Sequence, residues 1–300
     1  MTNITLIKDV PTQGGAPGRE RATRGRGRLR GVLPPPAVLV ASVVLILLIL
    51  VAAVPGLFTS ASPIVTNPVD ALLPPSGAHW FGTDELGRDL FTRVIYGARP
   101  SLLIGLGATV LSIFGGAVLG IAAALSGRAG DQILMRLADV LLSLPQLMLA
   151  LLVITVLGPG TVNTMLAIAI AFVPGYARIV RAEALVVRRS GYVEAATGLG
   201  LRRSVLIFRH ILPNALGPLL VLATVGFGTA IISASGLSFL GLGPQPPSPE
   251  WGAMLSDGRN YLSTAWWLGV FPGLAITLTV IAVNLVGRRA QARFTRRTAQ

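Results

Sequence analysis

Residues 37–57 read AVLVASVVLILLILVAAVPGL and contain no charged side chain. At about 1.5 Å of rise per residue, a helix of this length crosses a hydrocarbon core about 30 Å thick. Other apolar stretches follow at about residues 101–125, 140–157, 165–176, 216–234 and 266–286. The sequence therefore predicts an all-α membrane protein with six transmembrane helices.

The composition agrees with a membrane protein. The chain of 300 residues is 52% hydrophobic and 12% charged, whereas an ordinary soluble domain is about 25% charged. It has no cysteine, which excludes a disulfide framework, a thiolate metal site and a thiol nucleophile. The net charge of +13 would be compatible with nucleic-acid binding. However, the basic residues fall in tails and loops between the apolar stretches, so no nucleic-acid partner is expected.

The distribution of Lys and Arg predicts the orientation. If the N-terminus is cytoplasmic, 21 of the 25 basic residues lie on the inside, as the positive-inside rule requires. The outside then holds only Arg88, Arg93, Arg99 and Arg259. Both termini are therefore expected to be cytoplasmic.

Four segments are expected along the chain. Residues 1–33, rich in Arg and Gly, have the composition of a disordered basic cytoplasmic tail. Residues 34–100 hold the first transmembrane helix and an external loop, residues 101–290 hold the transmembrane domain with a cytoplasmic loop at 178–213, and residues 291–300 form a cytoplasmic tail. The first helix exceeds the usual 7–15 apolar residues of a secretory signal, which favours an uncleaved span.

Several kinds of chemistry are not expected. The only lysine is Lys8, and it lacks the glycine pattern of a P-loop. His79 and His210 are assigned to opposite sides of the membrane and cannot share a metal. The spans carry no carboxylate except Asp139 at a cytoplasmic end, so no catalytic or metal site is predicted and a proton-coupled carrier is disfavoured, while sodium coupling through backbone carbonyls stays open.

The loop at 178–213 carries a spaced pattern suited to docking. An acidic residue near a helix start suits the positive end of the helix dipole, two alanines allow close approach of another surface, and Gly198 and Gly200 permit a tight turn before a second helix. The alternative is that the alanine-rich segment simply contains good helix formers on a solvated loop. The six positions of the pattern are Glu194, Ala195, Ala196, Gly200, Leu212 and Pro213.

This pattern resembles the cytoplasmic coupling motif of ABC importer permeases. Two other segments resemble the C-type permease subunit of dipeptide, oligopeptide and nickel importers: residues 81–93, FGTDELGRDLFTR, and residues 237–243, LSFLGLG, followed by Pro249-Glu250-Trp251-Gly252. The resemblance covers about residues 39–289. The chain departs from the broad family pattern at His210, where an apolar Ile is usual, and at the extra Gly198.

The resemblance implies a type I ABC importer permease in a bacterial inner membrane. It implies a heterodimer with a second permease subunit, two ABC ATPase subunits and an external solute-binding protein. The chain itself would be no enzyme and would bind no cofactor, because ATP and Mg²⁺ belong to the partner ATPases. Dipeptides, oligopeptides, nickel chelates and glutathione-like compounds all remain open as solutes.

The outer face offers a second candidate site. Asp84, Arg88, Asp89 and Trp251 are expected to meet a solute-binding protein or the partner permease. The alternatives are a self-satisfied surface ion-pair cluster and, for Trp251, an aromatic anchor at the membrane interface.

Two other functions stay open for the whole chain. One is a stand-alone secondary carrier or channel, which is disfavoured by the lack of intramembrane charge and of inverted halves. The other is a non-transporting scaffold or assembly factor, against which the coupling pattern argues.

Gly116 and Gly120 in the second span are interpreted as helix-packing residues, because small residues four apart permit close contact between helices.

Overall fold

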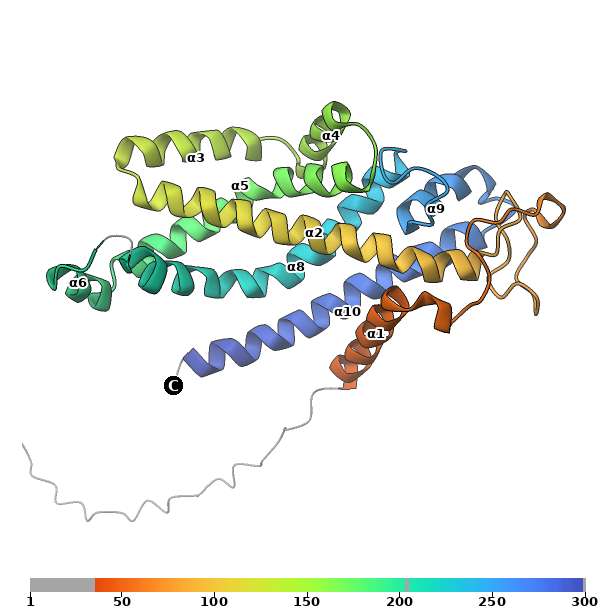
Figure 1. Cartoon of the computed structure of the whole chain (residues 1–300), viewed down its shortest axis with the longest axis horizontal. Coiled ribbons are helices and arrows are strands. Elements are labelled where there is room, and N and C mark those ends of the chain that lie inside the picture. The colour runs from red at the N-terminus through yellow and green to blue at the C-terminus, as the bar shows by residue number, and fades with distance from the viewer. Residues whose placement is uncertain (1–35, 203–204, 299–300) are drawn as a thin grey trace, which may run out of the picture. The chain divides into compact units, whose positions relative to one another are not determined.

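The computed structural model describes residues 36–202 and 205–298, so the basic tail expected at 1–33 lies outside the described residues. This part of the chain is helical and has no strand. Five helices are long and apolar enough to cross a membrane, which confirms the all-α membrane fold. These helices are α1 (Pro36–Ala53), α2 (Leu90–Leu125), α5 (Thr161–Arg188), α8 (Leu212–Phe239) and α10 (Trp267–Thr298) (Figure 1).

The span expected at 140–157 is broken. The expected range takes in the end of α3 (Arg128–Leu142) and all of α4 (Gln146–Leu157), which meet at an angle of 94°. Pro145 causes the break, because a proline disfavours helical conformation in the residue before it. Residues 140–157 are therefore not one continuous helix, and α4 projects across the direction of α3 (Figure 1). If α3 and α4 count together as one broken span, the described residues hold up to six spans.

Two other spans are longer than the apolar pattern predicts. Helix α2 begins at Leu90 and passes through Pro100, while α5 continues through Pro174 to Arg188. The start of α2 is fixed by Asp89, whose Oδ2 accepts a hydrogen bond from the Thr92 amide at 2.8 Å. Prolines are tolerated inside membrane helices because neighbouring groups satisfy the freed carbonyls.

Helices α2 and α5 pack very closely, which confirms the interpretation of Gly116 and Gly120. A Cβ at Gly116 would lie 2.4 Å from Cβ of Tyr176, and one at Gly120 would lie 2.5 Å from the carbonyl oxygen of Ala177. Small residues are needed where membrane helices approach so closely.

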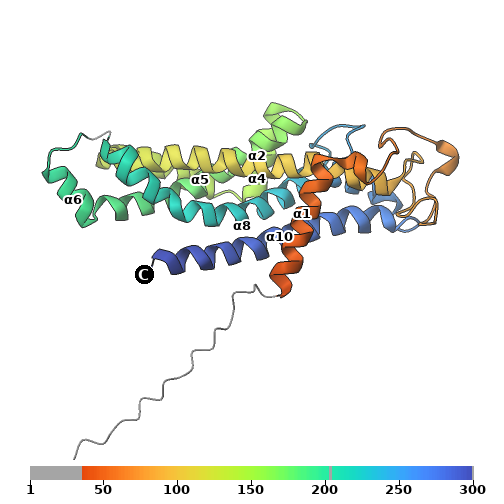
Figure 2. The ribbon, with the colours of Figure 1, turned by 60° about the horizontal axis from the view of Figure 1, so that its bottom comes forward.

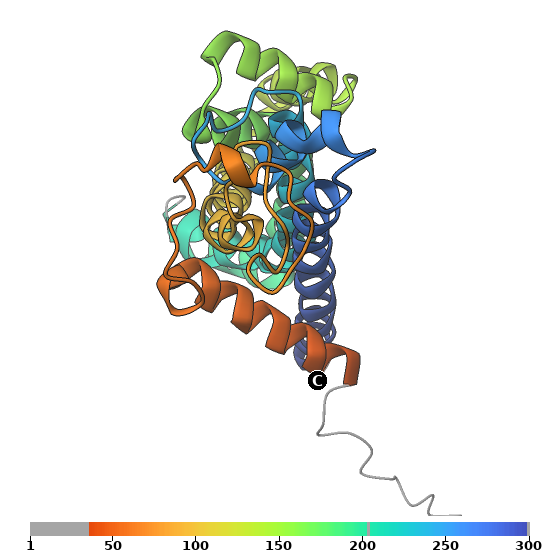
Figure 3. The same cartoon turned by 90° about the vertical axis from the view of Figure 1, so that its right-hand side faces the viewer.

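The described elements have two distinct ends. The short helix α6 (Gly191–Gly198) lies at the same end as the last turns of α10, while α9 (Trp251–Gly258) lies at the other (Figure 1). Helix α1 crosses the bundle (Figure 2), and α3 and α4 lie on the side opposite to it (Figure 3). The residues expected to form a C-terminal tail continue α10 as far as Thr298.

Candidate functional site

Helix α6 ends in a Schellman motif. The Leu201 amide donates to the carbonyl oxygen of Ala196 at 3.2 Å, and the Gly200 amide donates to that of Thr197 at 3.0 Å. Gly200 has φ of +77°, which glycine adopts without steric cost. The turn anticipated from the two glycines is thus centred on Gly200, while Gly198 is the last residue of the helix.

One face of α6 is held by its own chain. Val193, Ala196 and Leu206 are 4%, 8% and 7% exposed and form one apolar cluster. Ala196 therefore packs against the following segment of the chain. The coupling role expected of Ala195 and Ala196 stays a prediction, and of the two only Ala195 is exposed.

The opposite face of α6 is open. Ala195 is exposed, and Leu199, four residues later, is 82% exposed. Residues four apart share one side of a helix, so these two side chains form an apolar spot on the outside of α6. The sequence pattern included Ala195 but missed Leu199, although the spacing of four could have identified it.

The second half of the pattern lies beyond α6. A π-helix, η3 (Leu206–Ile211), leads directly into α8. Leu212 and Pro213 open α8, where a proline without an amide hydrogen is well tolerated. Helix α6 packs against η3 through Leu206, whereas Leu212 and Pro213 do not enter that cluster. Glu194 lies in the first half of α6.

Ion pairs connect α3 to the C-terminal half of α5. The Arg181 guanidinium donates to Asp131 with both contacts at 2.5 Å, and Arg178 pairs with Asp139. Arg178 and Asp139 are 56% and 47% exposed, so solvent screens their interaction.

The end of the bundle that holds α9 is organised around a buried carboxylate. Asp84 Oδ2 lies 2.6 Å from Nε of Arg88 and 3.3 Å from Nε of Arg93. The two arginine side chains are only 4% and 2% exposed. Arg93 also lies 3.8 Å from Asp257 of α9. We name these four residues the outer charge network, after the side on which the sequence predicts them. The network connects the segment before α2 to α2 and α9.

Asp89 and Trp251 are likewise engaged within the chain. Asp89 caps α2 and lies 3.0 Å from Nδ1 of His79. Trp251 is 1% exposed, and its indole donates to the Val94 carbonyl at 2.9 Å. Trp251 is therefore no anchor at the membrane interface. The ion pairs around Asp84 are buried, so they do not form the surface cluster that was the alternative interpretation. Docking by Asp84, Arg88, Asp89 and Trp251 stays a prediction.

Glu250 is a buried polar residue that the sequence analysis did not single out. Its carboxylate caps α9 by accepting from the amides of Gly252 and Ala253 at 2.9 and 2.8 Å, and Ser101 of α2 lies 3.3 Å away. Burial raises the pKa of Glu250, although these hydrogen bonds act in the opposite direction. Burial also raises the pKa of Glu85 and of Asp257.

Comparison with known proteins gives a consistent family. Residues 116–300 match the family described as the binding-protein-dependent transport system inner membrane component. The chain is 45% identical to the dipeptide transport system permease protein DppC of Alkalihalophilus pseudofirmus over 238 residues, which cover 79% of this chain and 78% of that protein. It is 50% identical to the probable D,D-dipeptide transport system permease protein DdpC of Escherichia coli, with 72% of each covered.

A third relative is named for glutathione transport. The glutathione transport system permease protein GsiD of Pectobacterium atrosepticum is 43% identical over 213 residues, which cover 71% of each protein. Among solved structures, the MetNI methionine ABC transporter in inward-facing conformations has a chain with a TM-score of 0.55 and 18% identity, covering 66% of this chain and 94% of that one. This likeness supports the type I permease fold.

Proposed function

Because the chain belongs to the family of binding-protein-dependent transport system inner membrane components, we propose that it forms half of the route by which a small peptide enters a bacterial cell. The chain is a multi-pass inner-membrane permease subunit of an ABC importer, a class in which ATP hydrolysis resides in separate subunits. Permeases of this family work with ATPase and substrate-binding partners.

The finer composition of the complex is part of the proposal. It comprises this chain, one related permease, two ATPases that hold ATP and Mg²⁺, and an external solute-binding protein. The similarity to permeases from dipeptide and glutathione systems supports a solute of two or three residues. An amide-linked solute of this size is favoured over a nickel chelate.

The observation that carries the coupling role is the geometry of α6. One face of this helix is secured by Val193 and Ala196, while Leu199 on the other face is 82% exposed. A short helix with one fixed and one open apolar face is suited to entering a groove on a partner. We infer that an ATPase subunit receives α6, the helix that contains Glu194, and that Ala195 and Leu199 contact that subunit.

The orientation is consistent with this role. Helix α6 and the last turns of α10 lie at the same end (Figure 1), and both are flanked by arginines, including Arg188, Arg189, Arg288 and Arg289. The positive-inside rule favours a cytoplasmic position for that end. The outer charge network then faces the solute-binding protein.

For docking of that protein, the described surface offers alternatives to the buried side chains. Val69 and Trp80 of the external loop are 89% and 66% exposed. The outer charge network holds this loop in place, so Asp84 and Arg88 act on docking indirectly, by fixing the shape of the loop.

Co-purification tests the proposal. A tagged form of the chain is isolated from its native membrane in mild detergent, and the accompanying proteins are identified by mass spectrometry. A second permease and Walker-motif ATPases are expected, and Glu194→Lys should remove the ATPases without removing the chain from the membrane. Thr197→Ser in the same helix is the matched control and should retain them.

Reconstituted uptake of alanyl-alanine separates the remaining functions. ATP-dependent uptake that needs the ATPases is the expected result. Recovery of the chain alone, with uptake that needs no ATPase, would establish the stand-alone carrier instead. An assembled complex in which ATP hydrolysis never responds to the binding protein or solute would indicate a scaffold.

A further inference from the structure

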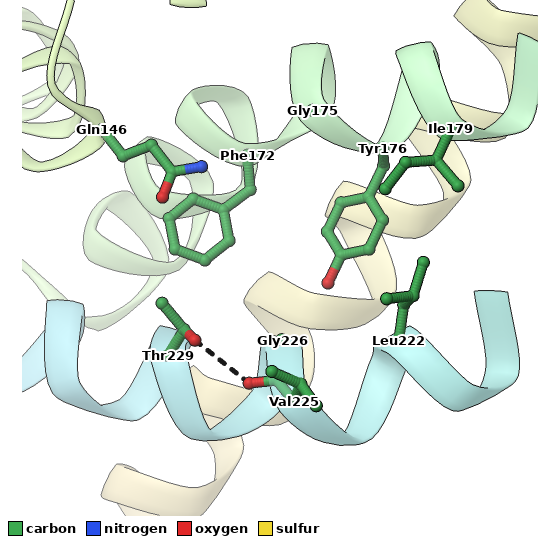
Figure 4. Close-up of a pocket in the computed structure, with 9 residues that line it drawn as sticks. All are labelled: Gln146, Phe172, Gly175, Tyr176, Ile179, Leu222, Val225, Gly226 and Thr229. Carbon is green, nitrogen blue, oxygen red and sulfur yellow. Dashed lines mark hydrogen bonds between the residues drawn. The ribbon is translucent and has the colours of Figure 1, made fainter. Parts of the chain in front are cut away.

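A hollow of about 220 Å³ lies between α5, α8 and the first residue of α4 (Figure 4). Its walls include Phe172 and Tyr176 of α5, and Leu222 and Thr229 of α8, with Gln146 at one end. They are mainly apolar, with an amide and two hydroxyl groups. Ligand sites typically combine apolar walls with a few placed polar groups in this way. We call this feature the α5/α8 hollow.

The close approach of α5 and α8 forms the floor of the hollow. A Cβ at Gly226 would lie 1.8 Å from the hydroxyl oxygen of Tyr176, so only glycine leaves room for the phenol there. Figure 4 shows the Tyr176 ring directed from α5 toward α8. Thr229 donates its hydroxyl hydrogen to the Val225 carbonyl at 3.1 Å, which leaves lone pairs of its oxygen available to a ligand.

The exposed face of α8 differs from a face made for lipid. On α2, Leu106, Val110 and Phe114 are 54%, 55% and 69% exposed, as expected of side chains that contact acyl chains. The exposed side of α8 also carries Val225 and Ile232, which are 44% and 56% exposed, but it mixes them with polar and small residues. Exposed Thr229 is followed by the partly exposed Ser233 and Gly236. Spacings of four and three place these residues on one side of the helix. Small and polar residues therefore continue from the hollow toward the α9 end.

The hollow carries no Asp, Glu, Lys, Arg or His among its lining residues. A peptide with ionised ends would gain no ion pair there, and removing those ends from water would be costly. The walls can contact only neutral parts of a solute, through apolar surface and through hydrogen bonds to main-chain amides. Contacts of this kind are weak, which suits a surface that must release what it touches.

We propose that the α5/α8 hollow is this chain's wall of the passage, and that it contacts a small peptide during transport. The proposal rests on the proposed importer function and adds the location of the passage. At ~30 Å³ per water molecule, the hollow has room for about seven waters, so it holds roughly one residue of the peptide. The rest of the solute lies in water or against the partner permease.

The absence of cysteine from the sequence makes a direct test possible. Thr229→Cys and Ser233→Cys place single thiols along the proposed passage, and Val110→Cys is the matched control on the lipid-type face of α2. The assembled complex in proteoliposomes is treated with a membrane-impermeant cationic methanethiosulfonate. This reagent attacks thiolates, which form in water, so the two α8 variants should react at least ~10-fold faster than Val110→Cys.

Labelling and uptake together decide the proposal. Modified Thr229→Cys should lose ATP-dependent uptake of alanyl-alanine, whereas treated Val110→Cys should retain it. Equal labelling rates, or full uptake after complete modification of Thr229→Cys, would overturn the passage while leaving the importer intact. Absence of ATP-dependent uptake by the unmodified wild-type complex would instead contradict the proposed function.

Discussion

The two ends of this permease differ in which side chains they bury. At the α9 end, Arg88 and Arg93 are 4% and 2% exposed, and both pair with Asp84. At the α6 end, the Arg178–Asp139 pair is about half exposed and Leu199 is 82% exposed. The α9 end, expected to face outward and here called the outer end, buries its charges in contacts within the chain. The α6 end, here called the inner end, leaves an apolar side chain exposed.

The largest expected effect comes from removing the shared carboxylate of the outer end. Asp84→Ala removes the carboxylate that two buried guanidinium groups share and leaves them only Glu85 and Asp257. It should lower the free energy of unfolding by about 3–5 kcal/mol. Asp139→Ala removes an exposed partner at the inner end and should cost about 0–1 kcal/mol. Thermal unfolding in detergent measures both variants, and equal losses would remove the distinction between the two ends.

The next effect tests whether the exposed leucine is an interface. Leu199→Asp should weaken binding of the ATPase by about 2 kcal/mol, or ~30-fold, if Leu199 enters a groove on that subunit. Its exposure means that the unfolding temperature of the isolated chain should stay unchanged. Leu199→Met keeps an apolar side chain and serves as the control. Unaltered ATPase binding by Leu199→Asp would show that this face of α6 is not the contact.

A smaller effect is expected in the turn that ends α6. Gly200→Ala forces alanine to φ of +77° and should destabilise the turn by about 1–2 kcal/mol. Gly198→Ala is the matched control, because Gly198 is helical with open space around it, and alanine is favoured there by about 1 kcal/mol. Faster amide hydrogen exchange in α6 should appear for Gly200→Ala and be absent for Gly198→Ala.

The smallest effect is a pH dependence confined to the outer end. Burial raises the pKa of Glu85, Glu250 and Asp257 in the folded chain. Between the ordinary and the raised pKa the folded state binds more protons, so stability falls as pH rises through that window. Melting curves recorded from about pH 4.5 upward should show this fall, and Glu250→Gln should reduce it. A slope unchanged by Glu250→Gln would assign the effect to the other carboxyls.

The sequence predicted the helical membrane fold because apolar length alone specifies a span. It misjudged boundaries where proline was involved. The expected spans at 101–125 and 165–176 begin just after Pro100 and end just after Pro174, but both prolines lie well inside the longer helices α2 and α5. Pro145 instead breaks a span that looked continuous. A proline in a membrane helix is tolerated where neighbouring groups satisfy the freed backbone carbonyls, and otherwise it breaks the helix. The sequence alone does not show which neighbours are present.

The candidate sites were predicted less completely than the fold. The pattern around Glu194 located α6 and its turn. It could not show that Ala196 is buried and Leu199 exposed, because this depends on how η3 packs against α6. The outer residues were identified, but their burial was not, because it requires contacts between Asp84 and residues of two other elements. The α5/α8 hollow left no sequence signal apart from small and polar residues on α8.

One further consequence follows from the uninterrupted course of α5. At ~1.5 Å per residue, Tyr176 lies roughly 22 Å from Thr161, and Arg188 lies roughly 40 Å from it. In mechanical terms α5 is a lever, with the hollow near its middle and α6 just beyond its inner end. For a pivot at Thr161, a displacement of ~4 Å at Arg188 moves the hollow wall by ~2 Å. The helix would therefore convert a coarse movement at the inner end into a finer adjustment of the hollow.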